Sequence, residues 1–467
     1  MKIRLFLINL LILFFANGTL LSQGSGSKEI LDKFIPDFHR DGDMKILKVE
    51  RNPLSFSYGG WITSVLIDER NGIVDGRMSE NEYGRKELQT SITIGKIWMK
   101  GYLWKNNFLY IRARDVYFDV LRENGIDIEN CDNTFDLDVC FFSFSNQCNS
   151  LRFFLGRKFF IIGTGLILNG RADGVELDIY SRYLDIKLIG SYTGLLSKDN
   201  NPYYQSNTDF SEGARRIFAG CTLSRVIYNQ TLYLLGLIQI DRGKEPADKK
   251  TRYSSEYYGA GFKGVYQNAF YFGEFIHEQG ESYLNLSDDS KPINAFAALF
   301  GLNYYVNFIK DFCNSVLMIR YFYGSGDGDR ISSKSSTGNL SGRDNGFLYF
   351  GSFSGGYALR PLLSNIHIFR AGLSISPFSD SKKRLFRRVN LISKYSYYLK
   401  DRAGGVINYG EATENSRDLG HGLDVALRWN IFYDFSFFLN YGLFVPGRAY
   451  SSEGNRNFIM GGVHISI

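Results

Sequence analysis

The chain has 467 residues, of which 22% are charged and 16% are aromatic, and its formal net charge is +6. Lys2 and Arg4 fall in a predicted leader, so the rest of the chain carries +4, a charge too mild to indicate a nucleic-acid partner. A soluble protein of this length would be expected to have two or three domains. Forty-nine glycines, 31 tyrosines, 39 phenylalanines and only eight prolines instead indicate many strands joined by tight turns.

The first 22 residues have the pattern of a secretory signal peptide. Lys2 and Arg4 precede an apolar centre from Leu5 to Phe15, and a plausible cleavage region, Thr19-Leu-Leu-Ser22, follows. An uncleaved anchor helix is the alternative, but the apolar run is short for a membrane span. We therefore expect a signal peptide at 1–22, a polar periplasmic segment at 23–53 and one folded domain at 54–467.

From Leu54 onward the chain consists of runs in which apolar and polar side chains alternate. In the run at 418–432, for example, Leu423, Val425 and Leu427 alternate with Asp424 and Arg428. A period of two predicts β-strands. Eighteen such runs are predicted, at 54–68, 87–103, 108–120, 135–145, 151–163, 173–182, 184–194, 214–227, 230–241, 256–266, 269–280, 293–308, 312–324, 363–377, 387–400, 418–432, 435–445 and 457–467.

Short and long connections alternate between these strands. Tyr228-Asn229 and Tyr433-Asp434 are tight, whereas 195–213 and 325–362 are long and polar. An even number of antiparallel strands with this alternation is typical of a transmembrane β-barrel of the bacterial outer membrane, with short periplasmic turns and long extracellular loops. A soluble β-helix or propeller is the alternative, but no repeat of fixed length is present. The last strand must then pair with the first, because lipid tolerates no open sheet edge.

Two connections fit the rule poorly, and the cysteines leave a question open. Asn169 to Ala172 is brief for an outer loop, and Phe378 to Phe386 is long for a periplasmic turn. Five cysteines are an odd number for a secreted protein, and three of them, Cys131, Cys140 and Cys148, have room for one disulfide of undecided pairing. Their spacing matches no common zinc site.

If the apolar face of each strand meets lipid, the charged residues between the apolar ones face the lumen. Nine bases and five acids occupy such positions, and they are candidate pore-lining residues: Arg112, Arg114, Lys187, Lys263, Arg320, Arg370, Arg388, Lys394, Arg428, Glu176, Asp178, Asp185, Glu274 and Asp424. One interpretation is that these charges pair across strands and hold the interior together. The other is an anion path, because rings of Arg and Lys select anionic solutes.

The longest connection, Ser325 to Leu362, also has two interpretations. It is rich in Gly and Ser and carries Asp327 and Asp329. It either folds into the mouth of the barrel as a gate or forms a surface loop, as most long loops do.

Several short segments resemble the alginate-export family of outer-membrane barrels. They are Gly156-Arg157-Lys158, Gly163-Thr-Gly165, Arg171-Ala-Asp173-Gly174-Val175, Tyr321 to Asp327, Gly420 to Asp424 and Tyr441 to Gly447. The resemblance implies an eighteen-stranded barrel and passive export of an acidic polysaccharide such as alginate through a conduit lined by arginine and lysine. It also implies that Arg157 and Arg171, which lie in the matching segments, belong to that conduit.

The leading hypothesis is therefore a passive outer-membrane channel for anionic solutes. Its expected partners are outer-membrane lipid, an anionic solute or polysaccharide and the barrel-assembly machinery, with no cofactor and no metal. The alternatives are a surface barrel that binds ligands through its loops, like an adhesin, and a general porin. An enzyme is disfavoured because no nucleophile or zinc motif accompanies the histidines; His277 beside Glu278 and His421 near Asp424 are the nearest candidates.

Overall fold

The structure is a computed structural model that describes residues 55–73, 85–104, 106–195, 213–242, 253–283, 290–306, 314–332, 339, 342–408, 410–451 and 454–466. The expected signal peptide and the segment at 23–53 lie outside these residues. No helix within them is both long and apolar enough to cross a membrane.

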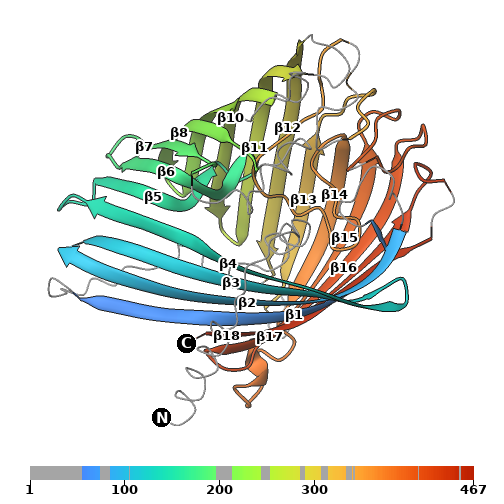
Figure 1. Ribbon diagram of the computed structural model, residues 1–467, viewed down its shortest axis with the longest axis horizontal. Coiled ribbons are helices and arrows are strands. Elements are labelled where there is room, and N and C mark those ends of the chain that lie inside the picture. Colours follow the sequence, from blue (N-terminus) through green and yellow to red (C-terminus); the bar gives the residue numbers. More distant parts are fainter. Residues whose placement is uncertain are drawn as a thin grey trace.

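Eighteen antiparallel strands form one closed sheet (Figure 1). This confirms both the predicted fold class and the predicted number of strands. The strands are β1 (Phe56–Ile73), β2 (Arg85–Trp104), β3 (Asn107–Glu123), β4 (Ile126–Ser145), β5 (Leu151–Ile162), β6 (Leu168–Ile179), β7 (Asp185–Tyr192), β8 (Arg216–Ile227), β9 (Gln230–Asp241), β10 (Tyr253–Tyr266), β11 (Ala269–Tyr283), β12 (Ser290–Tyr305), β13 (Val316–Gly324), β14 (Ile366–Ile375), β15 (Val389–Lys400), β16 (Asp418–Asn430), β17 (Phe435–Pro446) and β18 (Arg456–Ser466).

The sheet closes between its first and last strands. β1 pairs with β18 over ten residue pairs, from Trp61 opposite Ser466 to Arg70 opposite Asn457. Inside this seam the Thr63 hydroxyl and the Nδ1 atom of His464 lie 2.8 Å apart, and both residues are buried. Each of the eighteen strands pairs with a neighbour on both sides over at least part of its length, so the sheet closes as a hydrocarbon environment requires.

The two faces of the wall differ in the way the alternation predicts. Along β2, Ile92, Ile94 and Lys96 are buried, whereas the neighbouring Ile97 and Met99 are exposed. Similar exposed apolar side chains occur on most strands, among them Leu66, Leu155, Leu234, Phe275, Ile319, Phe369 and Leu439. An outward apolar face is what a barrel in lipid needs.

Two predicted boundaries are wrong, each for a local reason. β3 and β4 are joined by Asn124-Gly125 with φ of 50° and 80°, so the strands continue through 121–134, where the prediction placed a loop. Asn-Gly is the preferred pair for such two-residue turns. β6 begins at Leu168, which places the predicted outer loop at 169–172 inside a strand. The long connection after β14 is real and contains the short 3-10 helix η1 (Phe386–Arg388).

The first three cysteines, which have room for one disulfide, do not form one. Cys131, Cys140 and Cys148 are all free thiols. Cys131 and Cys140 both lie in β4, nine residues apart, and a strand rises about 3.3 Å per residue. That separation is far beyond the roughly 4.4–6.8 Å between Cα atoms that a disulfide spans.

The connection between β13 and β14, which we call the inner loop (residues 325–365), folds into the barrel. Its backbone forms bridges with β12 at Ile293 and with β6 at Leu168. Phe347 and Phe350 are fully buried in the interior cluster. Of the two interpretations of this segment, the inward fold is therefore the one the structure adopts.

Candidate functional site

Four basic side chains descend the inner side of four consecutive strands, and we call this set the cationic wall: Arg320 on β13, Arg370 on β14, Lys394 on β15 and Arg428 on β16. Arg320 is directly opposite Arg370 in the strand register. Lys394 is opposite Gly372, which lies two residues beyond Arg370 toward the short-turn end of the barrel. On β16 the partner of Lys394 is Asp424, and Arg428 lies four residues beyond Asp424 in the same direction. The set therefore steps from mid-wall toward that end.

Three of these bases, Arg320, Arg370 and Arg428, donate to neutral acceptors, and Lys394 lies over the ring of Tyr357. Arg320 donates to the Leu302 carbonyl at 2.9 Å and to Asn303 Oδ1 at 2.6 Å. Arg428 donates to Asn440 Oδ1 at 2.6 Å. Within the part of the chain that the structure describes, none of the four has a carboxylate oxygen within 4.0 Å of its charged nitrogens.

The inner loop lies against the cationic wall. Arg370 donates to the carbonyls of Ser354, at 3.2 Å, and of Gly355. Asp424, the one carboxylate directly opposite a base of this wall, faces Lys394 in the register and accepts the Tyr357 backbone N–H at 3.0 Å. The loop therefore narrows the lumen where the bases gather.

At its start the inner loop carries a perturbed carboxyl group. Asp327 accepts the Asn345 N–H at 2.8 Å and the Asp329 N–H at 3.2 Å. Burial, together with a hydrogen bond to the side chain of Asp329, raises the pKa of Asp327 to about 6.

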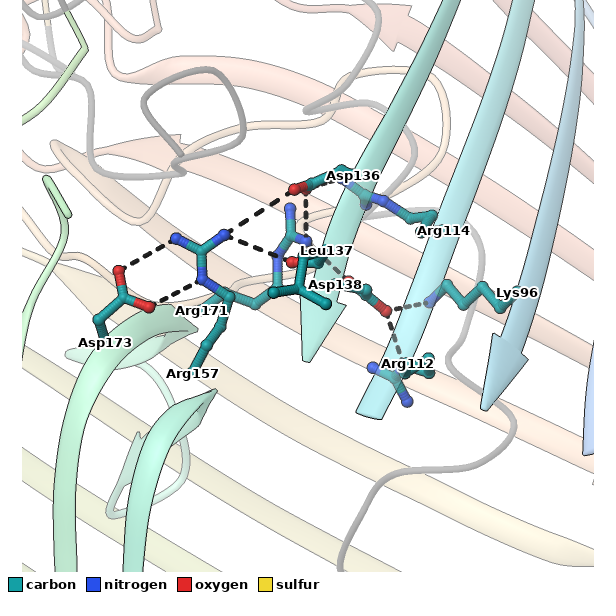
Figure 2. A network of polar contacts seen from close by, with 9 residues as sticks. All are labelled: Lys96, Arg112, Arg114, Asp136, Leu137, Asp138, Arg157, Arg171 and Asp173. Atoms are coloured by element: carbon teal, nitrogen blue, oxygen red, sulfur yellow. Dashed lines mark hydrogen bonds and ion pairs between the residues drawn. The ribbon is translucent and has the colours of Figure 1, made fainter. Parts of the chain in front are cut away.

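The opposite arrangement occurs on β2–β6, in a set we call the paired wall (Figure 2). Asp138 accepts Arg112 Nε at 2.6 Å and Arg171 Nη1 at 2.7 Å, and Lys96 Nζ lies 3.6 Å away. All of these groups are buried, and each base lies next to a carboxylate that compensates its charge. The other members of the set are Arg114, Asp136, Arg157 and Asp173.

The paired wall includes a bidentate contact that joins two strands. Arg157 on β5 binds both oxygens of Asp173 on β6, at 2.9 and 3.0 Å. Arg114 lies 3.5 Å from Asp136. Arg112, Arg114, Arg157 and Arg171, all predicted to line the pore, are thus brought together in one ion-pair network.

Acids and bases also pair on β5–β7. Lys158 binds Glu176 at 2.7 Å, and Lys187 lies 3.6 Å from Glu176 and 4.0 Å from Asp178. Glu176, Asp178 and Lys187 were predicted to face the lumen, and they form this second paired group.

The other predicted positions are scattered. Lys263 is exposed near the β10–β11 turn, and Asp185 is half-buried at the start of β7. Glu274 on β11 is buried and accepts hydrogen bonds from Thr164 and Tyr233. Arg388 lies outside the strands, in η1, where its guanidinium stacks over the ring of Tyr433 at 4.2 Å. Its assignment to a lumen strand is therefore wrong, because β15 begins one residue later.

The acids that pair with the arginines are not among the predicted lumen residues. Asp136 and Asp138 lie within a predicted strand and alternate with apolar residues, as lumen-facing residues do. The alternation that identified Arg112 and Arg114 as lumen residues could therefore have identified these two acids as well. Tyr357 and the carbonyls of Ser354 and Gly355 had no such signal, because a loop has no periodicity.

Neither histidine candidate forms a nucleophile and base pair in the structure. His277 contacts Asn294 at 3.0 Å and stacks on Phe296, whereas Glu278, on the other face of β11, accepts two tyrosine hydroxyls. His421 contacts the Tyr395 hydroxyl at 2.6 Å. Both histidines are more simply understood as strand residues packed among aromatic side chains.

Comparison with known structures shows the same fold in a group of outer-membrane channels. The Pseudomonas aeruginosa OccK2 (OpdF) structure in complex with glucuronate matches with a TM-score of 0.51 and 11% identity, over 88% of this chain and 98% of that chain. P. aeruginosa OprD matches with a TM-score of 0.51 and 10% identity, over 90% of this chain and 96% of that chain. Acinetobacter baumannii OccAB1 matches with a TM-score of 0.52 and 11% identity, over 88% of this chain and 96% of that chain.

The sequence comparisons give a family. Curated protein sequences returned no match. The family model for alginate export matches residues 202–460, more than half of the chain, and this range contains the whole cationic wall. The chain therefore belongs to the alginate-export family and is a β-barrel of the bacterial outer membrane.

Proposed function

We propose that this outer-membrane channel passes anionic solutes, and that the cationic wall selects them. The observation that carries the proposal is the row Arg320, Arg370, Lys394 and Arg428, four bases on consecutive strands without a carboxylate within 4.0 Å among the described residues. Basic rings at a constriction favour anions, and a narrow low-dielectric conduit focuses their field.

Carboxylate-bearing sugars are the solute class that fits this wall. Guanidinium groups bind a carboxylate through paired N–H donors, and Arg320 and Arg370 present two of them side by side. The aromatic rings near these bases, such as Phe272 at 5.0 Å from the Arg320 guanidinium, offer apolar surface to a sugar ring. The OccK2 structure holds glucuronate, which supports uronates and their polymers as the class to test.

The direct experiment is a measurement of ion selectivity in planar bilayers. Under a KCl gradient, the reversal potential of the purified protein should have the sign of chloride selectivity. Added glucuronate should reduce the chloride current in a concentration-dependent way, and uncharged glucose at the same concentration should not. Cation selectivity would contradict the proposal, and an absence of conductance would favour a closed barrel that binds ligands through its loops.

A further inference from the structure

Six aromatic side chains line the lumen at the short-turn end of β2–β5, and we call this set the aromatic patch. Its members are Trp98 and Tyr102 on β2, Phe108 and Tyr110 on β3, Phe141 on β4 and Phe154 on β5. They point inward, because residues next to them in the strands, such as Met99, Leu109 and Leu155, are exposed on the outer face. The interior of an outer-membrane barrel is ordinarily polar, so this cluster of rings calls for an explanation.

The strand register brings the rings into contact with one another. Tyr110 on β3 is directly opposite Phe141 on β4, and their ring centres are 5.5 Å apart. Trp98 stacks on Tyr110 at 6.0 Å, and Phe154 meets Phe141 edge to face at 5.8 Å. Aromatic pairs that attract each other have centres about 4.5–7 Å apart. The rings therefore form one continuous surface across four strands.

Packing alone accounts for only part of this surface. Tyr110 and Phe141 are 3% and 5% exposed, and they belong to a small cluster that is separate from the main interior cluster. Trp98, Phe108 and Phe154 pack against that pair but remain partly exposed. Because these rings point inward, their exposed surface faces the lumen. Contiguous apolar surface of this kind marks a site for a ligand that has an apolar face of its own.

A buried lysine lies within the aromatic patch. Lys100 is directly opposite Tyr110 in the register and is 5% exposed. Its Nζ atom lies 3.8 Å from the ring centre of Phe108 and 4.7 Å from that of Tyr102. Among the residues that the structure describes, this ammonium has no hydrogen bond and no carboxylate oxygen within 4.0 Å. Lysine is seldom this buried without an anionic partner, and its three N–H donors find no lone pair on a ring face.

The acids around the patch are engaged by other bases. Lys158 on β5 binds Glu176 at 2.7 Å. Arg112, which belongs to the paired wall and is opposite Trp98, binds Asp138 at 2.6 Å (Figure 2). Lys100 is therefore a cation that the neighbouring carboxylates leave to an anion from outside the chain.

We propose that the aromatic patch and Lys100 bind one unit of an acidic sugar, a pyranose ring that carries a carboxylate. The C–H face of the pyranose packs against the exposed parts of Trp98 and Phe108, and the carboxylate accepts hydrogen bonds from the Lys100 ammonium. The cationic wall steps toward the same end of the barrel, so a solute on its path reaches the patch there.

This inference rests on the proposed function and adds a selection by shape to the selection by charge. The cationic wall attracts any small anion. The patch instead distinguishes a ring from an open chain of the same charge, because only the ring presents a flat apolar face. A neutral sugar would leave Lys100 without its anion.

Block of the chloride current by glucuronate and by gluconate in planar bilayers tests the patch. Gluconate carries the same charge and a similar number of atoms but has no ring. Glucuronate should therefore block the wild-type channel at a concentration at least fivefold lower than gluconate does. Phe108→Leu keeps an apolar side chain and removes the ring, and it should abolish this difference. Lys100→Met keeps the side-chain length and removes the charge, and it should raise the half-blocking concentration of glucuronate at least fivefold.

Phe142→Leu is the matched control. Phe142 lies on the lipid side of β4, beside Phe141 in the strand, and its ring centre is 6.2 Å from that of Trp104. This variant loses a ring at the same level of the barrel but on the other face, so its block by both solutes should equal that of the wild type. Heat-dependent migration on SDS gels verifies that each variant is a folded barrel, and Trp98→Leu replaces Phe108→Leu if the latter does not fold.

The outcomes separate a failure of the patch from a failure of the proposed function. If glucuronate blocks the wild type but blocks Phe108→Leu and Lys100→Met at the same concentration, the patch is not a binding position. Equal block of the wild type by glucuronate and gluconate would also overturn it. If glucuronate does not reduce the wild-type current at all, the solute class in the proposed function is wrong, and the patch falls with it.

Discussion

The paired wall and the cationic wall contain similar numbers of basic side chains in the same sheet, yet those side chains have different partners. On β2–β6, five bases meet Asp136, Asp138 and Asp173 at ion-pair distance. On β13–β16, Arg320, Arg370 and Arg428 donate to amide oxygens and backbone carbonyls instead, and Lys394 lies over the ring of Tyr357. A count of lumen charges does not distinguish these cases, because the position of the acids decides whether a base holds the wall together or faces a solute.

The two walls should respond differently to loss of charge. A buried base that loses its partner carries an uncompensated charge, which destabilises the fold. A base that has only neutral partners loses its field when it is neutralised, while the wall around it keeps its hydrogen bonds. Stability should therefore depend on the paired wall and selectivity on the cationic wall.

The largest expected effect is on the stability of the paired wall. Asp138→Asn removes the countercharge shared by Lys96, Arg112 and Arg171 while preserving side-chain size. Breaking a buried pair in this way costs about 3–5 kcal/mol. Urea unfolding in lipid vesicles should show this loss, and an unchanged midpoint would mean that the network does not stabilise the barrel.

A smaller effect is expected from the matched change on the cationic wall. Asp424→Asn removes the one carboxylate opposite Lys394, but the amide oxygen still accepts the Tyr357 N–H. Stability should change by about 1 kcal/mol or less, as for a hydrogen bond that is largely retained. The chloride preference measured by reversal potential should increase, and a decrease would show that Asp424 does not oppose the bases.

The smallest effect concerns pH and the inner loop that covers the cationic wall. Because the pKa of Asp327 is raised to about 6, the folded loop holds this proton more tightly than an unfolded chain does. The contribution to stability is complete below pH 4 and is lost as the pH rises through 6. In planar-bilayer recordings, brief closings and openings of the channel conductance should therefore be more frequent at pH 7.5 than at pH 5.

Asp327→Asn supplies the control for that dependence. The amide cannot ionise, so the difference in event frequency between pH 5 and pH 7.5 should shrink. A dependence that stays the same in Asp327→Asn would assign it to another group, such as a histidine with an ordinary pKa.

Much of the barrel could be predicted because alternation is a local property. Eighteen runs of period two gave eighteen strands, and the requirement for closure gave the β1–β18 pair. The missed turn at Asn124-Gly125 was also local, and its two-residue signal lay inside a region interpreted as a loop. Boundaries at Leu168 and Val389 depend on where neighbouring strands stop pairing, which a single run does not encode.

The site was less predictable because pairing across strands depends on register. Alternation placed Arg112 and Arg320 on the inner face alike, but only the register and the bulge at Asp138 bring an acid to the first. The same holds for the inner loop: its contacts with Arg370 join residues 15 and 16 positions apart through a loop without periodicity. Such contacts are visible only in three dimensions.

The central claim is that the two walls divide stability and selectivity between them, and one crossed measurement tests it. Arg157→Gln and Arg370→Gln remove the same charge from the paired and the cationic wall, and each variant is measured for urea midpoint and for KCl reversal potential. We predict that Arg157→Gln lowers the midpoint more, and that Arg370→Gln shifts the reversal potential more toward zero. Equal shifts of reversal potential in both variants, or a larger shift in Arg157→Gln, would contradict the account.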